Sequence, residues 1–363
     1  MRRPTLTASF AVVLVGLVLS VPEASASSSG RALRAMAVNG DRPPVASPVI
    51  AAAGDIACDP VSSAFHHLRG QPGACRMKYT SNLLAHARRR GNLAAVLTLG
   101  DNQYFCGGYR AFRRSYDPTW GRVKDITYPT PGDHDYIIHS NPNATDCSDQ
   151  ADAAGYYRYF GDAALDPNTE KSWYSFDVTT TDGTAWHIIS LNAGCEFVGG
   201  CGAGSPQETW LRDDLAANPA TCTLAYWYAP RFSSGRHGSD PAYSAFWQDL
   251  SAAGAEIVLN GHDHDYERFA PQTPEQDVSP DGIREFVVGT GGVGHEAMRP
   301  HRRELNSAVA NDRTFGVLEL ELHPASYRWR FVSEKGHAFS DSGTGECHPS
   351  PPFDGQPPTH LPP

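Results

Sequence analysis

Two histidines follow an apolar run in the segment NGHDHDYER, and their spacing is suited to binding metal ions. His262 and His264 stand two residues apart, directly after AEIVLNG, which predicts a buried strand ending at Gly261. Imidazole nitrogens with this spacing can bind one metal ion or two adjacent ones. Taken alone, the pair could equally be ordinary loop histidines, so its interpretation depends on the rest of the chain.

Carboxylates and tyrosines occupy comparable positions after other apolar runs. A single Gly-Asp pair is ordinary turn chemistry and indicates little. Several predicted strands that end in this way favour a common pocket. Glycine permits a sharp turn close to an ion, while carboxylate, imidazole and phenol groups supply ligands. The other ends are Gly54-Asp55, Gly100-Asp101 with Tyr104 shortly after it, Gly132-Asp133-His134-Asp135, and the turn Tyr228-Ala229-Pro230.

Alternating strands and helices must position these side chains. Ser205, Pro206 and Glu208 are typical of a helix start, with an N-cap, a proline in the first turn and a capping box. The alternation predicts an α/β fold with two packed mixed sheets between helices. Predicted strands are 48–57, 93–104, 126–136, 172–180, 184–193, 222–230, 255–261, 284–292, 314–322 and 326–332, and predicted helices are 79–91, 153–160, 205–218 and 241–254.

The first 26 residues have the features of a secretory signal peptide. Arg2 and Arg3 precede an apolar run, and small residues ending at Ala26 form a cleavage signal. The apolar run is short for a transmembrane helix, so we expect a secreted protein with cleavage near Ala26 and no stable membrane anchor; a retained anchor is the alternative. Residues 27–47 are predicted to be a disordered leader, 48–348 one folded domain, and 349–363 a disordered Pro-rich tail.

The formal charge of −10 becomes −11 after cleavage, since 28 basic and 39 acidic side chains remain. This excess of acidic side chains argues against binding to duplex nucleic acid, because proteins that bind it normally carry a basic patch. It leaves open a small phosphorylated substrate, because bound metal ions reverse the local field. The sequence does not determine the oligomeric state.

All eight cysteines lie after the cleavage site. An even number in an exported chain predicts up to four disulfides rather than a thiolate metal site. The sequence does not fix the pairing, and the arrangement that we favour is Cys58 with Cys75, Cys106 with Cys147, Cys195 with Cys201, and Cys222 with Cys347.

The order of these motifs resembles the calcineurin-like metallophosphoesterase superfamily, most closely its purple acid phosphatase branch. GDNQY matches a GDxxY motif, GHDHDYER matches GHxHxYER, and GDIA has Ala57 where the wider superfamily has a histidine. The resemblance extends from Val49 to Val332. It implies a metallophosphoesterase-type sandwich of two mixed β-sheets flanked by helices for the predicted domain.

The resemblance also implies a site for two metal ions, bridged by Asp101. Asp55, Tyr104 and His264 would complete the first position, where a tyrosinate ligand favours iron. His262 and residues of the two remaining loops would bind the second ion. Such a pair of ions activates a water molecule for in-line attack on phosphorus, without a covalent phospho-enzyme.

Three further residues acquire roles from the same resemblance. His134 would protonate the leaving oxygen or stabilise its charge, and Asp135 would orient the imidazole. His237 lies nine residues after Tyr228, where related enzymes carry a substrate-contacting histidine. By itself, His237 is more typical of a surface residue.

Two departures from the family pattern fall on the second metal position. Asp133 replaces an asparagine, and Tyr228 replaces a histidine. Both changes make the site harder and more negative, which disfavours zinc relative to calcium, magnesium, manganese or iron. Hydrolysis could be retained with another second metal, or that metal could bind weakly with low or redirected activity, or the protein could be a non-catalytic relative that uses its cleft for binding.

We expect a secreted metallophosphatase that hydrolyses phosphomonoesters. A phosphodiesterase or phospholipase-type hydrolase would use the same centre and differ in the wall of the cleft. The inactive binding module is the alternative from another functional class.

Overall fold

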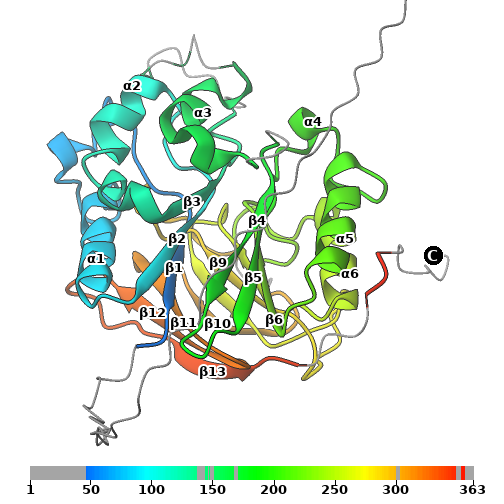
Figure 1. Cartoon of the computed structure of the whole chain (residues 1–363). Helices are drawn as coiled ribbons and strands as arrows, with labels where there is room; N and C mark the ends of the chain where they lie inside the picture. The colour runs from blue at the N-terminus through cyan, green and yellow to red at the C-terminus, as the bar shows by residue number, and fades with distance from the viewer. Residues whose placement is uncertain are drawn as a thin grey trace, which may run out of the picture. The chain divides into compact units, whose positions relative to one another are not determined.

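Two β-sheets flanked by helices form the folded part of the chain, as expected (Figure 1). The computed structural model describes residues 46–136, 144, 145, 147, 151–166, 171–299, 303–348 and 353–355. The proposed signal peptide, nearly all of the predicted leader and most of the predicted tail lie outside these residues.

The first sheet has six strands in the order β13-β12-β11-β1-β2-β3, and its β1, β2 and β3 are parallel. The first strand is small and wholly buried, VIAAA, and it lies between β2 and the antiparallel β11, with Ala51 opposite both Val96 and Glu319. The strands are β1 (Val49–Ala53), β2 (Leu93–Leu99), β3 (Thr127–Thr130), β11 (Gly316–His323), β12 (Ser326–Ser333) and β13 (Ser342–Glu346).

The second sheet has seven strands in the order β10-β8-β9-β7-β6-β5-β4. Its centre, β5-β6-β7-β9, is parallel, and β4 pairs with β5 in the antiparallel direction. The strands are β4 (Tyr174–Thr179), β5 (Ala185–Ser190), β6 (Cys222–Tyr226), β7 (Ile257–Asn260), β8 (Tyr266–Phe269), β9 (Arg284–Val288) and β10 (Ser307–Asn311).

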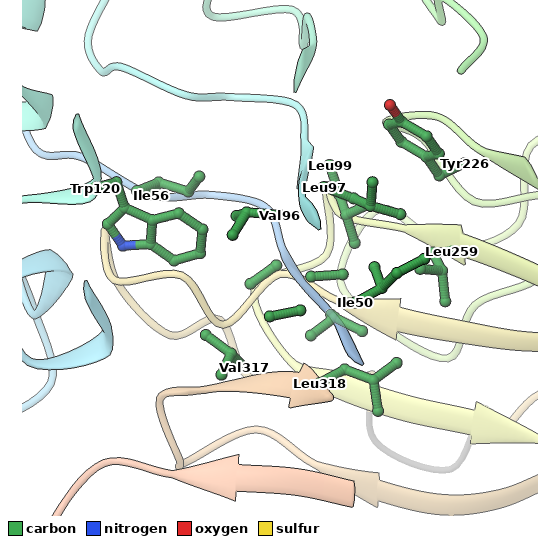
Figure 2. Close-up of a cluster of buried hydrophobic side chains, with 14 of the residues drawn as sticks. Ile50, Ile56, Val96, Leu97, Leu99, Trp120, Tyr226, Leu259, Val317 and Leu318 are labelled. Carbon is green, nitrogen blue, oxygen red and sulfur yellow. The ribbon is translucent and has the colours of Figure 1, made fainter. Parts of the chain in front are cut away.

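Apolar side chains from both sheets meet in one core. Figure 2 shows Ile50, Leu97 and Leu318 of the first sheet on the side of Leu259 and Tyr226 of the second. Successive side chains of a strand point to opposite faces of a sheet. A second apolar cluster therefore lies on the other face of the seven-stranded sheet, beneath α5 and α6.

Helices cover the outer faces, with α1 beside the six-stranded sheet and α5 and α6 beside the other (Figure 1). At the start of α5, Ser205 Oγ accepts from Glu208 N at 3.3 Å, and the Glu208 carboxylate accepts from Gly204 N. The predicted N-cap is confirmed. The Glu208 carboxylate accepts from the residue before the N-cap, whereas in a capping box it would accept from the N-cap residue itself. The helices are α1 (Met77–Arg89), α2 (Tyr109–Ala111), α3 (Ala154–Phe160), α4 (Cys195–Val198), α5 (Pro206–Ala217) and α6 (Ser244–Ala252), with short helical turns η1 (His66–Leu68), η2 (Phe112–Tyr116), η3 (Trp120–Ile126), η5 (Ala151–Ala153), η6 (Gly161–Ala164) and η7 (Pro241–Tyr243).

Four disulfides join the cysteines, and all four pairings that we favoured are confirmed. The bond between Cys222 and Cys347 ties the start of β6 to the residue after β13, across 125 residues of sequence. Four disulfides fit an extracellular environment. No helix in the described ranges has the length and apolar character to cross a bilayer.

Candidate metal centre

Loops that follow β1, β2, β3, β6 and β7 meet at one end of the two sheets. Parallel neighbours bring their carboxyl ends to the same edge, which is where open α/β sheets bind ligands. The resulting cleft has a volume of about 220 Å³. Its walls are formed by Asp101, Tyr104, Phe105, Asp133, His134, Tyr228, Arg236, His237, His262, His264 and Glu296.

Three of the residues predicted to hold the first ion are in direct contact. Tyr104 Oη donates to Asp55 Oδ1 at 2.8 Å and lies 3.0 Å from His264 Nε2. His264 Nε2 is 3.3 Å from the same carboxylate oxygen. Burial, followed by the charges of Asp101 and Asp55, raises the pKa of Tyr104 well above its usual value. A bound cation would reverse this effect and favour the phenolate.

Asp101, the predicted bridge between the two ions, contacts Tyr228 and lies near Asp133 and His134. Its Oδ2 accepts a hydrogen bond from Tyr228 Oη at 2.5 Å, and the same phenol lies 3.3 Å from Asp55 Oδ1. Burial, followed by the charge of Asp133, raises the pKa of Asp101 well above its usual value. Tyr228 therefore lies between the two carboxylates, with its oxygen directed into the cleft.

The second position combines carboxylate and imidazole donors. Within the described part of the chain, one group of carboxylates and imidazoles could hold an ion. Its members are Asp101, Asp133 and His134, whose ligand atoms all lie within 4.8 Å of one another. On the other side, His262 Nδ1 is buried and has no hydrogen-bond partner. An unpartnered buried nitrogen beside carboxylates fits a metal ligand, because leaving it unbound costs free energy.

Three of the predicted ligands have backbones in the left-handed region. The φ angles are 58° at Asp55, 46° at Asp101 and 72° at His262. Non-glycine residues rarely adopt such angles, which typically occur at functional sites where surrounding contacts hold them. Gly100 explains part of the local sequence: a Cβ there would lie 2.3 Å from Tyr228 Cδ2, so only glycine lets the phenol approach.

His134 lies at the cleft, but Asp135 does not hold its ring. His134 Nδ1 is 2.6 Å from the carbonyl oxygen of Phe105, and Nε2 is 4.0 Å from Asp101 Oδ2. The hydrogen bonds of the Asp135 carboxylate go to Asn102, Gly132 and Gln103. The expectation that Asp135 orients His134 is wrong, because the carboxylate is buried beneath the loop and ties it to the loop after β2.

His237 lies at the rim of the same cleft. Its ring packs against that of His262 with centroids 4.2 Å apart, and its Nε2 is 3.2 Å from Glu296 Oε2. The side chain is 43% exposed, so the position is intermediate between the surface and the site. Sequence reasoning missed Arg236 and Glu296, although the SGRHG segment could have indicated Arg236 through its adjacency to His237.

The segment GTGGVGH, from Gly289 to His295, passes beside the centre. Gly291 N donates to Gly54 O and Val293 N donates to Asp55 O, at 2.8 and 3.0 Å. This segment is therefore a loop that supports the backbone of the first ligand.

Comparisons with known proteins agree with this fold. The profile of the calcineurin-like phosphoesterase family matches residues 49–266. No curated protein sequence matches the chain. Among the solved structures of similar fold are a purple acid phosphatase and GAP50, both at low sequence identity.

The purple acid phosphatase PPD1 from yellow lupin (Lupinus luteus) has a TM-score of 0.61 and 17% identity over 84% of this chain and 55% of its own. GAP50, described as the anchor in the inner membrane complex of Plasmodium, has a TM-score of 0.56 and 14% identity over 86% of this chain and 92% of its own. With its motifs and its two mixed sheets, the chain belongs to the calcineurin-like phosphoesterase family.

Proposed function

We propose that the protein is a secreted, metal-dependent phosphatase that hydrolyses phosphomonoesters. The observation that carries this proposal is the meeting of seven donor side chains from five loops in one cleft. The signal-like N-terminal sequence and the four disulfides support secretion.

Two ions would be held by residues whose chemistry fits them. Asp55, Tyr104 and His264 would bind one ion, which we expect to be iron because of the phenol ligand. Asp133, Tyr228 and His262 would bind the other, and Asp101 would contact both. When bound, two such ions lower the pKa of a water molecule and neutralise charge on the phosphoryl oxygens.

His134 is suited to protonate the leaving oxygen. A carbonyl oxygen only accepts hydrogen bonds, so the contact with Phe105 O requires a proton on Nδ1. The proton that the ring can exchange is therefore carried by Nε2, which faces Asp101. Asp135 acts on this step indirectly, by holding the loop.

Activity assays with defined metals test the proposal. Protein stripped with a chelator is reloaded with one ion at a time, and hydrolysis of p-nitrophenyl phosphate is compared with that of bis-p-nitrophenyl phosphate, alongside elemental analysis. We expect metal-dependent turnover that is faster on the monoester, and its loss in Asp101→Asn. Faster turnover of the diester would instead indicate a phosphodiesterase or phospholipase-type enzyme.

A non-catalytic binding module is the second candidate. The hydrogen bond from Tyr228 to Asp101 favours it, because a protonated phenol there competes with the second ion for the carboxylate. The likeness in fold to GAP50, described as an anchor, is compatible with this interpretation. Folded protein without turnover on either ester, whatever the ion, would favour the binding module.

A further inference from the structure

The segment from Ser233 to Gly238, here called the rim loop, is held in place by a buried carboxylate between the two metal-site histidines. Asp263 accepts hydrogen bonds from Ser233 Oγ at 2.5 Å, His237 N at 2.7 Å and Gly238 N at 3.2 Å. Gly235 packs so closely against Asp263 that a Cβ would lie 2.2 Å from its Cγ. The rim loop is thereby fixed to the same turn that carries His262 and His264.

Two further charged side chains hold the rim loop. Glu267 accepts from Ser234 N at 2.7 Å and from Ser234 Oγ at 2.5 Å. Arg299 donates to the carbonyl oxygens of Arg236 and His237, at 2.9 and 2.5 Å. A segment fixed by three ionic side chains is preorganised, and preorganisation lowers the entropic cost of binding a ligand.

This rigid backbone presents Arg236 to the metal cleft. The Arg236 side chain is 66% exposed, and its Nη1 donates to Glu296 Oε1 at 2.7 Å. Glu296 also contacts His237, so one carboxylate serves two basic groups at the rim. Among the described residues that line the cleft, Arg236 is the sole lysine or arginine.

We propose that Arg236 binds the phosphoryl group of the substrate, and that Glu296 is the partner it leaves when the substrate enters. A guanidinium offers a planar pair of N–H donors that matches two phosphoryl oxygens. Glu296 is an anion at the entrance of an anion-binding cleft, so it competes with the substrate for Arg236. This inference rests on the proposed phosphoesterase function, but its test uses binding as well as turnover.

Calorimetric titration of the metal-loaded protein with inorganic phosphate measures the contact directly. Arg236→Ala should weaken phosphate binding by about tenfold or more, the size expected for a charge-assisted hydrogen bond, and Arg236→Lys by less. Glu296→Gln should strengthen binding several-fold, because it removes the competing charge. Arg313→Ala is the matched control, since Arg313 is 89% exposed and pairs with Asp312 instead.

Turnover adds an independent readout. With a phosphomonoester, Arg236→Ala should raise KM more than it lowers kcat, and Glu296→Gln should lower KM. Unchanged phosphate affinity in both variants would overturn the inference and leave a surface ion pair, even in an active enzyme. If no ester is hydrolysed but Arg236→Ala still weakens phosphate binding, the inference stands and the phosphatase function fails.

Discussion

In the proposed two-metal site, Tyr228 would influence which ion the second position accepts. Its oxygen lies 2.5 Å from Asp101 and 3.3 Å from Asp55, so it already occupies the inner side of the cleft. Burial, followed by the charge of Asp101, raises the pKa of Tyr228 well above its usual value. An ion that binds the phenolate must displace this proton, and the oxygen donor that results favours oxygen-preferring ions over zinc.

Replacing Tyr228 and Asp133 together tests this preference. The double variant Tyr228→His, Asp133→Asn should support several-fold higher zinc-dependent phosphatase activity than the native protein, because it restores a nitrogen and a neutral oxygen ligand. Tyr228→Phe is the control, since it removes the phenol oxygen without adding an imidazole. An ordinary iron and zinc pair in elemental analysis of the native protein would contradict the proposed metal preference.

At the scale of elements, the loop after β3 depends on one buried carboxylate. Asp135 is fully buried, and its Oδ2 accepts from Asn102 N, Asn102 Nδ2 and Gly132 N at 2.9 to 3.0 Å. Burial raises its pKa to about 6, while these donors act in the opposite direction. The carboxylate joins the two loops that carry Asp101 and His134, so it sets their spacing.

Asp135→Ala should therefore reduce stability as well as activity. It removes the acceptor of four buried N–H donors, and we expect the free energy of unfolding to fall by about 3 kcal/mol or more in urea denaturation. Asp135→Asn keeps one acceptor and should lose less. The exposed Asp162→Ala serves as the control; an Asp135→Ala protein of native stability but without activity would instead indicate a direct catalytic role.

The sequence predicted the strands that end in Gly-Asp or Gly-His, because buried apolar runs followed by glycine have a strong local signal. It missed β8, β10 and β13, whose alternation is weak: SGTGE of β13 has no apolar side chain. The bonds of Asp135 and the contact of Arg236 with Glu296 were also missed. Both contacts join loops that are far apart in the sequence, and a local sequence pattern does not encode contacts of this kind.

At the scale of the whole molecule, one disulfide connects the two sheets. Cys222 is the first residue of β6 in the seven-stranded sheet, and Cys347 directly follows β13 of the other sheet. The bond closes 125 residues, whereas Cys195 and Cys201 close 6. Longer closed loops restrict the unfolded chain more strongly.

Removing each disulfide should show this difference. Chain-entropy arithmetic gives a loss of about 5 kcal/mol for Cys222→Ala with Cys347→Ala, and about 2 kcal/mol for Cys195→Ala with Cys201→Ala. Guanidinium denaturation of the two double variants measures both losses. Equal losses would show that residual structure in the unfolded chain, and not loop closure, controls stability.

A buried acid between β6 and β7 makes stability depend on pH. Glu256 is 2% exposed and accepts from Thr223 N at 2.5 Å, and burial raises its pKa from 4.5 to about 8. Between pH 4.5 and 8 the folded protein keeps a proton that the unfolded chain has lost, so stability falls as pH rises through this window. A tenfold change in proton affinity corresponds to about 1.4 kcal/mol, so the loss of stability across the window is at most several kcal/mol.

Glu256→Gln should remove this dependence, because an amide imitates the protonated acid. The melting temperature of the variant should match that of the native protein near pH 4.5 and exceed it progressively up to pH 8. Glu321→Gln, at a partly exposed position of β11, is the control. If the melting temperatures of the native and Glu256→Gln proteins differed by the same amount at every pH in this range, Glu256 would be ionised in the folded state.

The pairing of β1 with β11 has a consequence for how the protein is made. Val49 lies opposite Glu321, so the strand that leads into Asp55 gains its second neighbour only after about 270 further residues have left the ribosome. Until then, the VIAAA edge can pair with other nascent chains. The strand that leads into the candidate metal centre is thus translated first but is among the last to complete its strand pairing.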